Sequence, residues 1–297
     1  MKIVLTPNPY RDKQFRTVQQ ARKILEGCGV QTATCLPFDV DRDYELPKSI
    51  EFQDLNREIK DADMLVCFGG DGTILHASKL ATAHNLPILG INIGTMGFIA
   101  ELEAGELELL RRLPAGDYTI EPRSMIDVTV TGANGQRLLH ETALNDAVVT
   151  KGAIARVVQV SVYCDNVEAT SFSGDGVIIA TPTGSTAYSM SAGGAIVDPG
   201  MDCLIVTPIC PHSLADRSVV LGPDAPLEVR LVTRNTPPDA GVAVDGTTIC
   251  PMVDGTRLEI SAAARKSRFI QLSASSFYQT LGKKLTGTEP AEIERKA

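Results

Sequence analysis

The residues best placed to do chemistry lie in a glycine-rich turn with a single carboxylate, residues 69–73 (GGDGT). An apolar run over 64–68 predicts a buried strand before it, and residues 74–81 have the spacing of one apolar helical face after it. Glycines remove side-chain bulk and allow positive φ, and the amides of a helix N-terminus attract phosphate. A carboxylate repels phosphate, so Asp71 is interpreted as a general base for a hydroxyl that attacks a phosphoryl group. From these residues alone, the alternative is a tight turn in which Asp71 or Thr73 caps the helix.

A second motif, residues 175–194, also runs from an apolar strand into a turn and ends in paired glycines. Short hydroxyl side chains can hold ribose hydroxyls and phosphate oxygens, and the ring of Tyr188 can lie against a base or a nicotinamide. An ordinary loop rich in Ser, Thr and Gly is the alternative, but a flexible linker does not normally carry a preceding strand, a Pro and a Tyr. The short hydroxyl side chains that could do this are those of Thr183, Ser185, Thr186, Ser189 and Ser191.

The first part of the chain alternates between strand and helix patterns, which predicts a parallel sheet covered on both faces. Ligands of such sheets sit at the carboxyl ends of strands, where Asp71 and residues 94–98 lie. The expected strands are 3–5, 31–36, 64–68 and 87–92, and the expected helices are 17–25, 55–59, 74–83 and 106–113.

After about Arg123 the apolar residues recur with period two, which predicts antiparallel sheets. The fold class is therefore an α/β N-terminal domain with a parallel sheet plus a C-terminal antiparallel β-sandwich-like domain. One more strand over 269–272 and a helix over 277–285 close the chain. We divide it into an α/β domain over 1–122, a β-rich domain over 123–264 and a C-terminal segment over 265–297.

The composition of the 297 residues excludes several classes of protein. A net charge of −8 argues against nucleic acid or an anionic membrane as the main partner. The 7 cysteines include no Cys-x-x-Cys pair and the 4 histidines are scattered, so we expect reduced thiols, no metal site and a cytoplasmic location. The sequence has neither a Gly-x-x-x-x-Gly-Lys-[Ser/Thr] nor a Gly-x-Gly-x-x-Gly motif, which disfavours a P-loop kinase and a Rossmann dehydrogenase.

The combination of motifs resembles the NAD kinases, which phosphorylate the adenosine-ribose 2′-hydroxyl of NAD to make NADP. The resemblance covers nearly the whole chain and rests on residues 69–73, 92–98, 144–146, 175–176, 181–194, 207–214 and 245–246. It implies the two-domain NAD kinase fold, with the C-terminal segment returning to the first domain. It also implies NAD and ATP (or polyphosphate) as substrates, a divalent cation such as Mg²⁺ delivered with ATP, and a homodimer or homotetramer whose subunits complete each other's sites.

The resemblance also implies roles for individual residues, first of all Asp71 as the catalytic base. Phe98 could equally be a core residue, His76 a solvated surface histidine and Arg156 a surface charge. Four positions depart from the family pattern. Many relatives have Glu at 146, Lys or Arg at 173, Pro at 195 and Gln at 247, where this chain has Asp146, Ser173, Ala195 and Thr247. The positions that match nucleotide-contacting residues are Gly72, His76, Phe98, Asn145, Asp146, Arg156, Asp175, Thr186, Ala187, Tyr188 and Ser191.

Two other functions compete with this interpretation. Lipid and sphingoid-base kinases share the GGDGT turn, but the chain has no amphipathic basic segment that would reach a membrane-bound substrate. A non-catalytic NAD(H)-binding regulator would keep the binding residues and would have no need of Asp71.

Overall fold

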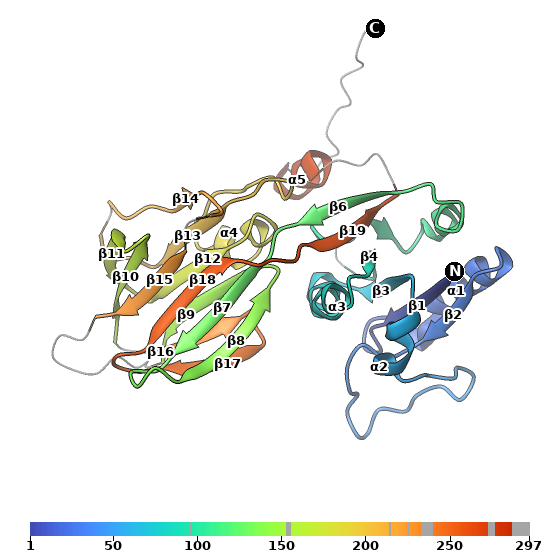
Figure 1. The fold of residues 1–297 in the computed structure, drawn as a ribbon. Helices are drawn as coiled ribbons and strands as arrows, with labels where there is room; N and C mark the ends of the chain where they lie inside the picture. Colours follow the sequence, from blue (N-terminus) through green and yellow to red (C-terminus); the bar gives the residue numbers. More distant parts are fainter. Residues whose placement is uncertain are drawn as a thin grey trace, which may run out of the picture. The chain divides into compact units, whose positions relative to one another are not determined.

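The computed structural model describes residues 1–94, 97–152, 156–213, 215–224, 226–232, 240–272 and 277–286. The chain divides into two compact units (Figure 1). Unit 1 comprises Met1–Glu121 and Arg268–Ala297, and unit 2 comprises Pro122–Ser267. The sequence pattern predicted boundaries after residues 122 and 264, close to those of the two units.

Unit 1 is built on one sheet with the strand order β2-β1-β3-β4-β19-β6, and β5 pairs with β4. The pairs β1–β2, β1–β3, β3–β4, β4–β5 and β4–β19 are all parallel, as the alternating pattern predicted. The strands are β1 (Lys2–Pro7), β2 (Gln31–Thr34), β3 (Met64–Gly69), β4 (Pro87–Asn92), β5 (Leu102–Glu103), β6 (Thr119–Arg123) and β19 (Ser267–Gln271).

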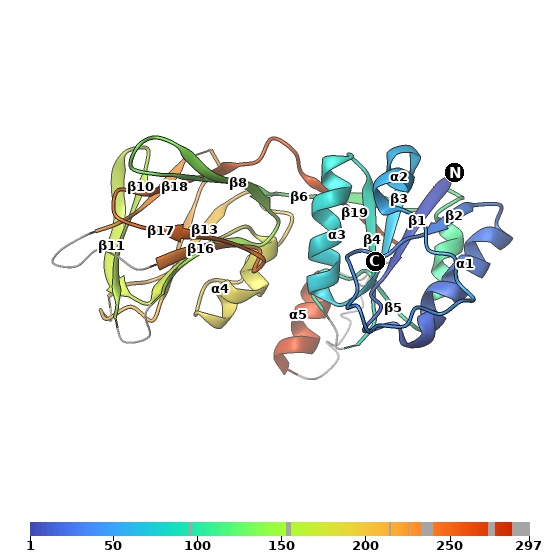
Figure 2. The same ribbon diagram turned by 90° about the horizontal axis from the view of Figure 1, so that it is seen from below.

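Helices α1 (Arg16–Gly27) and α3 (Asp71–Ala83) lie on opposite faces of this sheet (Figure 2). The apolar stripe of α1, which includes Val18, Ala21 and Leu25, packs in one core with the buried side chains of β1, β3 and β4. The shorter or terminal helices are η1 (Lys13–Phe15), α2 (Leu55–Glu58), η2 (Ile59–Asp61), η3 (Leu107–Arg112) and α5 (Phe277–Thr286).

Two of the expected helices in unit 1 were wrong in detail. The segment expected to form a helix over 106–113 is the 3-10 helix η3, whose tighter turn still buries Leu107 and Leu110 against α1. The helix expected from Ile74 begins three residues earlier, at Asp71, so the carboxylate belongs to the first turn of α3.

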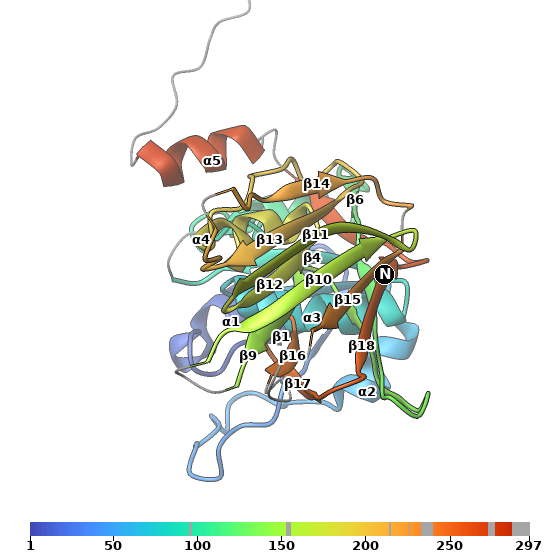
Figure 3. The same ribbon diagram turned by 90° about the vertical axis from the view of Figure 1, so that its left-hand side faces the viewer.

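Unit 2 consists of two six-stranded antiparallel sheets with one shared core (Figure 3). Alternate residues such as Ile126, Val128 and Val130 point into this core, which is why the sequence alternates with period two. The first sheet has the order β11 (Val167–Gly174), β10 (Val158–Cys164), β15 (Leu227–Leu231), β18 (Arg257–Ala262), β7 (Ile126–Thr131), β8 (Arg137–Ala143). The second has the order β14 (Val219–Leu221), β13 (Leu204–Ile209), β12 (Gly176–Ala180), β9 (Asp146–Lys151), β16 (Ala240–Val244), β17 (Thr248–Met252).

All seven cysteines are free, and Cys35, Cys67, Cys203 and Cys250 are buried. Burial raises the pKa of the Cys35 and Cys67 thiols to about 12, so neither is a reactive thiolate at neutral pH. Among the helices that the structure describes, none combines the length and apolarity needed to cross a bilayer.

Candidate active site

The carboxylate of Asp71 is fixed by the connection that follows β4. Its Oδ2 accepts the amide of Phe98 at 2.8 Å, and its Oδ1 accepts the amide of Ile99 at 3.2 Å. Gly97 is required for this contact, because a Cβ on Gly97 would lie 1.7 Å from Asp71 Oδ1. The side chain is half-buried. Each carboxylate oxygen has a second lone pair, so Asp71 can still accept a proton from a substrate hydroxyl.

The glycines of the GGDGT turn act differently from the expectation. None of Gly69, Gly70 and Gly72 adopts positive φ, so that part of the prediction was wrong. Gly69 is needed because a Cβ there would lie 2.6 Å from the side chain of Thr73. The Cβ positions of Gly70 and Gly72 have no atom within 4 Å, so open space lies above the start of α3. A phosphate can therefore approach the amides of Asp71 and Gly72, the first two of α3, whereas the amide of Thr73 already donates to the carbonyl of Gly70 at 2.9 Å.

His76 and Phe98, the other predicted site residues of unit 1, make contacts of their own. His76 is on α3, where its Nε2 lies 3.1 Å from the carbonyl oxygen of Pro37 and its ring meets Phe38 edge-on. Phe98 is half-buried, and the ammonium of Lys284 on α5 lies 4.1 Å from the centre of its ring. Phe98 thus presents a face to a cation and is not enclosed by the core.

In unit 2, the turn that holds Asn145 and Asp146 is organised by Asp245. The Asp245 carboxylate accepts the amides of Leu144 at 3.0 Å, Asn145 at 2.9 Å and Asp146 at 3.2 Å. The amide of Asp245 in turn donates to the carbonyl of Asp146 at 3.0 Å. Asp245 is buried and has φ of 48°, a conformation that an Asp tolerates better than most residues. The whole turn is therefore held in one geometry.

Asp146 occupies an environment that favours its protonated form. The side chain is 5% exposed. Burial, and secondly the charge of Asp245, raise the pKa of Asp146 to about 7. Near neutral pH the carboxyl is thus divided between a form that donates and a form that only accepts hydrogen bonds.

The loop after β12 closes against the same turn. Gly184 makes the approach possible, because a Cβ there would lie 2.0 Å from the carbonyl oxygen of Asn145. The hydroxyl of Thr181 donates to the carbonyl of Leu144 and accepts the amide of Gly184. Two buried polar atoms at this junction, Asn145 Oδ1 and Thr183 Oγ1, have no hydrogen-bond partner among the described residues. Such atoms are costly unless a ligand or water satisfies them.

Two of the five hydroxyl side chains that could hold a nucleotide form hydrogen bonds within the fold. Ser185 and Ser189 are fully buried. Ser185 bonds the amide and carbonyl of Val197, and Ser189 lies 2.9 Å from the hydroxyl of Thr207, so both hold the loop in place. The four predicted contacts in the loop lie in η4 (Thr183–Thr186) and in α4 (Tyr188–Ser191) with the residue between them: Thr186, Ala187, Tyr188 and Ser191.

Within unit 2, the structure does not bring Asp175 and Arg156 together with Asn145. Asp175 precedes β12 and Asn145 precedes β9. The two strands are antiparallel and Asp175 lies opposite Lys151, so about 20 Å of strand separates the two positions. Asp175 forms an ion pair with Lys151 at 2.6 Å. Arg156 is exposed and precedes β10, whose first residue pairs with Gly174, at the same end of the sheet as Asp175.

No group of three or more metal-ligating side chains occurs in the part of the chain that the structure describes. Asp71 is a single carboxylate at the edge of an open space, which fits a Mg²⁺ ion that a nucleotide carries and that one carboxylate and water assist.

Sequence reasoning missed several residues that shape these sites. Gly97 and Asp245 lie in the motifs at 92–98 and 245–246. Gly97 contacts Asp71 and Asp245 contacts the 144–146 turn, and no local sequence pattern indicates these contacts. Lys151 carried no signal beyond its place at the end of an apolar strand. Its ion pair places a cation at Asp175, two residues after Ser173, the position where relatives were expected to carry one.

Comparison with known proteins identifies the family. A model described as the ATP-NAD kinase N-terminal domain matches residues 12–118, and one described as the ATP-NAD kinase C-terminal domain matches residues 144–272. The NAD kinase of Symbiobacterium thermophilum is 42% identical over 229 residues, 77% of this chain and 80% of the relative. The NAD kinase of Acetivibrio thermocellus is 32% identical over 288 residues, 96% of this chain and 97% of the relative.

Solved structures agree in fold. Yeast NADH kinase complexed with NADH has a TM-score of 0.81 at 21% identity, covering 100% of this chain and 90% of that one. An NAD kinase from Archaeoglobus fulgidus in complex with ATP has a TM-score of 0.72 at 23% identity, covering 97% and 100%. The expected two-domain NAD kinase fold is confirmed. From the family models and the sequence relatives, the chain belongs to the ATP-NAD kinase family, whose members act as transferases on NAD.

Proposed function

We propose that this chain transfers the γ-phosphoryl group of ATP to the 2′-hydroxyl of the adenosine ribose of NAD, which gives NADP and ADP. The observation that carries the proposal is the carboxylate of Asp71, which backbone amides hold beside an open helix N-terminus. An oriented carboxylate and unpaired amides are the two groups that phosphoryl transfer to a hydroxyl needs.

In the proposed reaction, a bond forms between the ribose 2′-oxygen and the γ-phosphorus, and the bond from that phosphorus to the β–γ bridging oxygen breaks. The 2′-hydroxyl proton goes to Asp71 and the electron pair of the broken bond leaves with ADP. The amides at the start of α3, beside the open space at Gly70 and Gly72, stabilise the charge on the phosphoryl oxygens. A Mg²⁺ ion delivered with ATP would neutralise part of the charge on the phosphates.

Unit 2 is proposed to bind the dinucleotide. Asn145 Oδ1 and Thr183 Oγ1 are buried and unsatisfied, so hydroxyl or amide groups of NAD can complete their hydrogen bonds. Asp146 and Tyr188 belong to the same two loops, and the 46% exposed Tyr188 offers a ring on which a base can stack. We further propose binding roles for Gly72, His76, Phe98, Arg156, Asp175, Thr186, Ala187 and Ser191, and assembly into a homodimer or homotetramer.

A product assay tests the proposal. The purified chain is incubated with NAD, Mg²⁺ and ATP, and NADP is read with an NADP-specific dehydrogenase. An NAD analogue that lacks only the adenosine 2′-hydroxyl should give no phosphorylated product, and transfer to that analogue would disprove the 2′ assignment. Polyphosphate in place of ATP identifies the donor. Transfer of label from ATP to diacylglycerol or sphingosine, without NADP formation, would favour the lipid-kinase alternative.

A further inference from the structure

Arg11 is an exposed guanidinium on the connection between β1 and α1. It makes no ion pair and no hydrogen bond through its side chain with any residue that the structure describes. Its Nη1 lies only 3.5 Å from the position that a Cβ would take on Gly94, in the connection that follows β4. The cation therefore reaches across the carboxyl ends of the sheet, where parallel sheets bind their ligands.

The connection that carries Arg11 is bonded directly to the candidate active site. The amide of Asn8 donates to the carbonyl of Phe68 at 2.8 Å and so prolongs the β1–β3 pairing. The side-chain amide of Asn8 donates to the hydroxyl of Thr73, in the GGDGT turn, at 2.7 Å. The amide of Arg11 closes a turn onto the carbonyl of Asn8 at 3.1 Å. These bonds fix the start of the Arg11 side chain relative to the start of α3.

The neighbouring acid does not neutralise Arg11. Asp12 is 1% exposed and both of its oxygens accept amides of α1, from Thr17 at 3.0 Å and from Val18 at 2.9 Å. Its charge is used to cap α1. Asp12 is also the only acid between residues 8 and 15, so this connection presents cations, Arg11 and Lys13, without a free carboxylate.

Arg11 and Asp71 approach the connection after β4 at different residues, Arg11 at Gly94 and Asp71 at residues 97–99. A base and a cation placed beside one segment suit a reaction between a hydroxyl and a polyanion. We propose that Arg11 binds the phosphate chain of the phosphoryl donor, ATP or inorganic polyphosphate. This proposal rests on the proposed function. The planar fork of a guanidinium matches two phosphate oxygens at once.

Direct binding tests this role independently of turnover. Isothermal titration of the full chain with MgATP, without NAD, and with inorganic tripolyphosphate is carried out on wild type, Arg11→Ala and Arg11→Lys. Loss of a charge-assisted contact predicts roughly 10- to 100-fold weaker binding of both ligands to Arg11→Ala. Arg11→Lys keeps the charge without the fork and should fall between. In the NADP assay, the KM for ATP should rise with the same factor while the KM for NAD stays within about two-fold.

Arg57→Ala is the matched control, because Arg57 is an exposed arginine of the same unit in α2, which leads to the amino end of β3. It should bind both ligands as wild type does. Unchanged binding of both ligands to Arg11→Ala, or an equal loss in Arg57→Ala, would overturn the role of Arg11. Weaker ATP binding with unchanged tripolyphosphate binding would also overturn it, because the phosphate chain would then not be the part that Arg11 contacts.

The two proposals can fail separately. If wild type makes NADP and Arg11→Ala binds the donors normally, the kinase activity stands and the Arg11 site is wrong. If wild type makes no NADP but its tripolyphosphate binding depends on Arg11, the phosphate site stands and the proposed reaction is wrong.

Discussion

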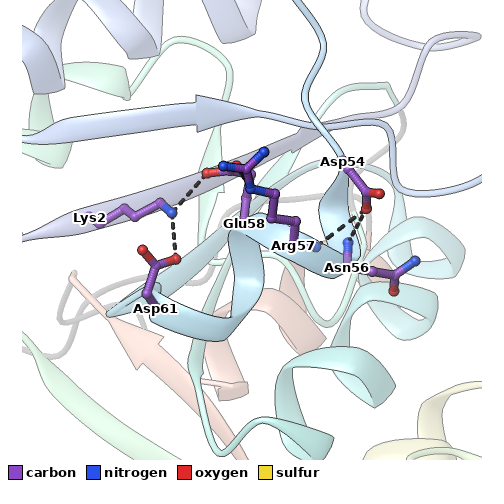
Figure 4. Close-up of polar contacts among 6 residues, drawn as sticks. All are labelled: Lys2, Asp54, Asn56, Arg57, Glu58 and Asp61. Carbon is purple, nitrogen blue, oxygen red and sulfur yellow. Dashed lines mark hydrogen bonds and ion pairs between the residues drawn. The ribbon is translucent and has the colours of Figure 1, made fainter.

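The two edges of the parallel sheet in unit 1 treat charge in opposite ways. At the amino edge, formed by Lys2 and residues 54–63, Lys2 Nζ pairs with Glu58 at 2.8 Å and Asp61 at 2.5 Å (Figure 4). At the carboxyl edge, formed by residues 8–11, 70–73, 93–94 and 97–99, Asp71 is held by backbone amides alone, and Arg11 makes no ion pair among the described residues. A charged group without a charged partner remains available to a ligand.

The pKa values at the amino edge record its pairing. Hydrogen bonds from the ammonium of Lys2 to Asp61, and then to Glu58, raise the pKa of Lys2, and the same bond lowers the pKa of Asp61. Each group therefore favours its charged form, which suits a structural ion pair and does not suit proton transfer near neutral pH.

The largest expected effect comes from replacing Asp71 on the carboxyl edge by Asn, with the same replacement of an acid on the amino edge as the control. Asp71→Asn should lower kcat by about 10²–10⁴-fold, because the amide cannot accept the ribose proton. Asp54→Asn is the matched control: Asp54 also begins a helix, where it caps the amides of Asn56 at 2.8 Å and Arg57 at 3.3 Å (Figure 4), and Asn caps equally well. The measurement is kcat in the NADP assay.

Asn at position 71 leaves one of the amides of Phe98 and Ile99 without an acceptor, so a small loss of thermal stability should accompany the loss of activity. Activity of Asp71→Asn within tenfold of wild type would remove Asp71 from the role of base. The two edges would then not differ in function at this pair of acids.

Gly97→Ala tests whether the position of the carboxylate matters as much as its presence. The new methyl group would overlap Asp71 Oδ1, so either the side chain or the connection after β4 must move. A displacement on the order of 1 Å is expected to lower kcat by roughly 10²-fold. Gly105→Ala is the control, because nothing lies within 4 Å of its Cβ position. If Gly97→Ala kept full activity, the amide bonds that fix Asp71 would be irrelevant to catalysis.

The sequence was sufficient to predict strands β1 to β4 and helices α1 to α3 of unit 1 in their order, and both classes of sheet. The buried parallel strands β3 and β4 have no charged residue and one polar side chain, Asn92 at the end of β4, whereas the half-buried strand β7 alternates. The local pattern therefore reports burial. Asp71 could be placed at the carboxyl end of β3 for the same reason. The helical conformation of residues 107–112 was harder to predict, because 3-10 and α-helices bury similar apolar spacings.

Contacts between distant segments could not be predicted. The bond from Phe98 to Asp71 spans 27 residues, and the bond from Asn145 to Asp245 spans 100. Local patterns report which face of an element is buried, but they do not report which backbone amides will meet a given carboxylate. The buried serines Ser185 and Ser189 illustrate the limit, because hydroxyls that bond within the fold and hydroxyls that face a ligand look alike in sequence.

Asp146 in unit 2 extends the comparison to a buried acid. The charged group that shifts its pKa is a second acid, Asp245. Its pKa is about 7 in the native chain and 3.8 is its ordinary value, so between these pH values the native state binds more protons than the unfolded state. Stability from this group therefore falls as pH rises from about 4 to about 7. Asp146→Asn should remove this pH dependence. The full pKa shift of Asp146 corresponds to a change of at most about 4 kcal/mol in the free energy of unfolding.

The measurement for Asp146 is the melting temperature of wild type and Asp146→Asn at pH 5 and at pH 8. The melting temperature of wild type should fall between pH 5 and pH 8 by more than that of Asp146→Asn. Asp165→Asn, an exposed acid in the β10–β11 turn, should leave the pH dependence unchanged. Parallel pH dependences for wild type and Asp146→Asn would show that Asp146 is ionised at neutral pH, as the lowered pKa of Asp61 favours at the amino edge.

The smallest expected effect is on the amino edge itself. Lys2→Met keeps an apolar stem beside β3 but removes the cation from Glu58, whose side chain is 17% exposed, and from the mostly exposed Asp61. We expect a loss of about 1 kcal/mol, a fall of roughly 2–4 °C in melting temperature, and no change in the KM for ATP. Arg11→Ala should do the reverse, with an unchanged melting temperature and a raised KM for ATP. If Lys2→Met instead changed the KM for ATP, or Arg11→Ala changed the melting temperature, the comparison would fail. The presence or absence of an ion pair would then not distinguish structural charged groups from ligand-binding ones on this sheet.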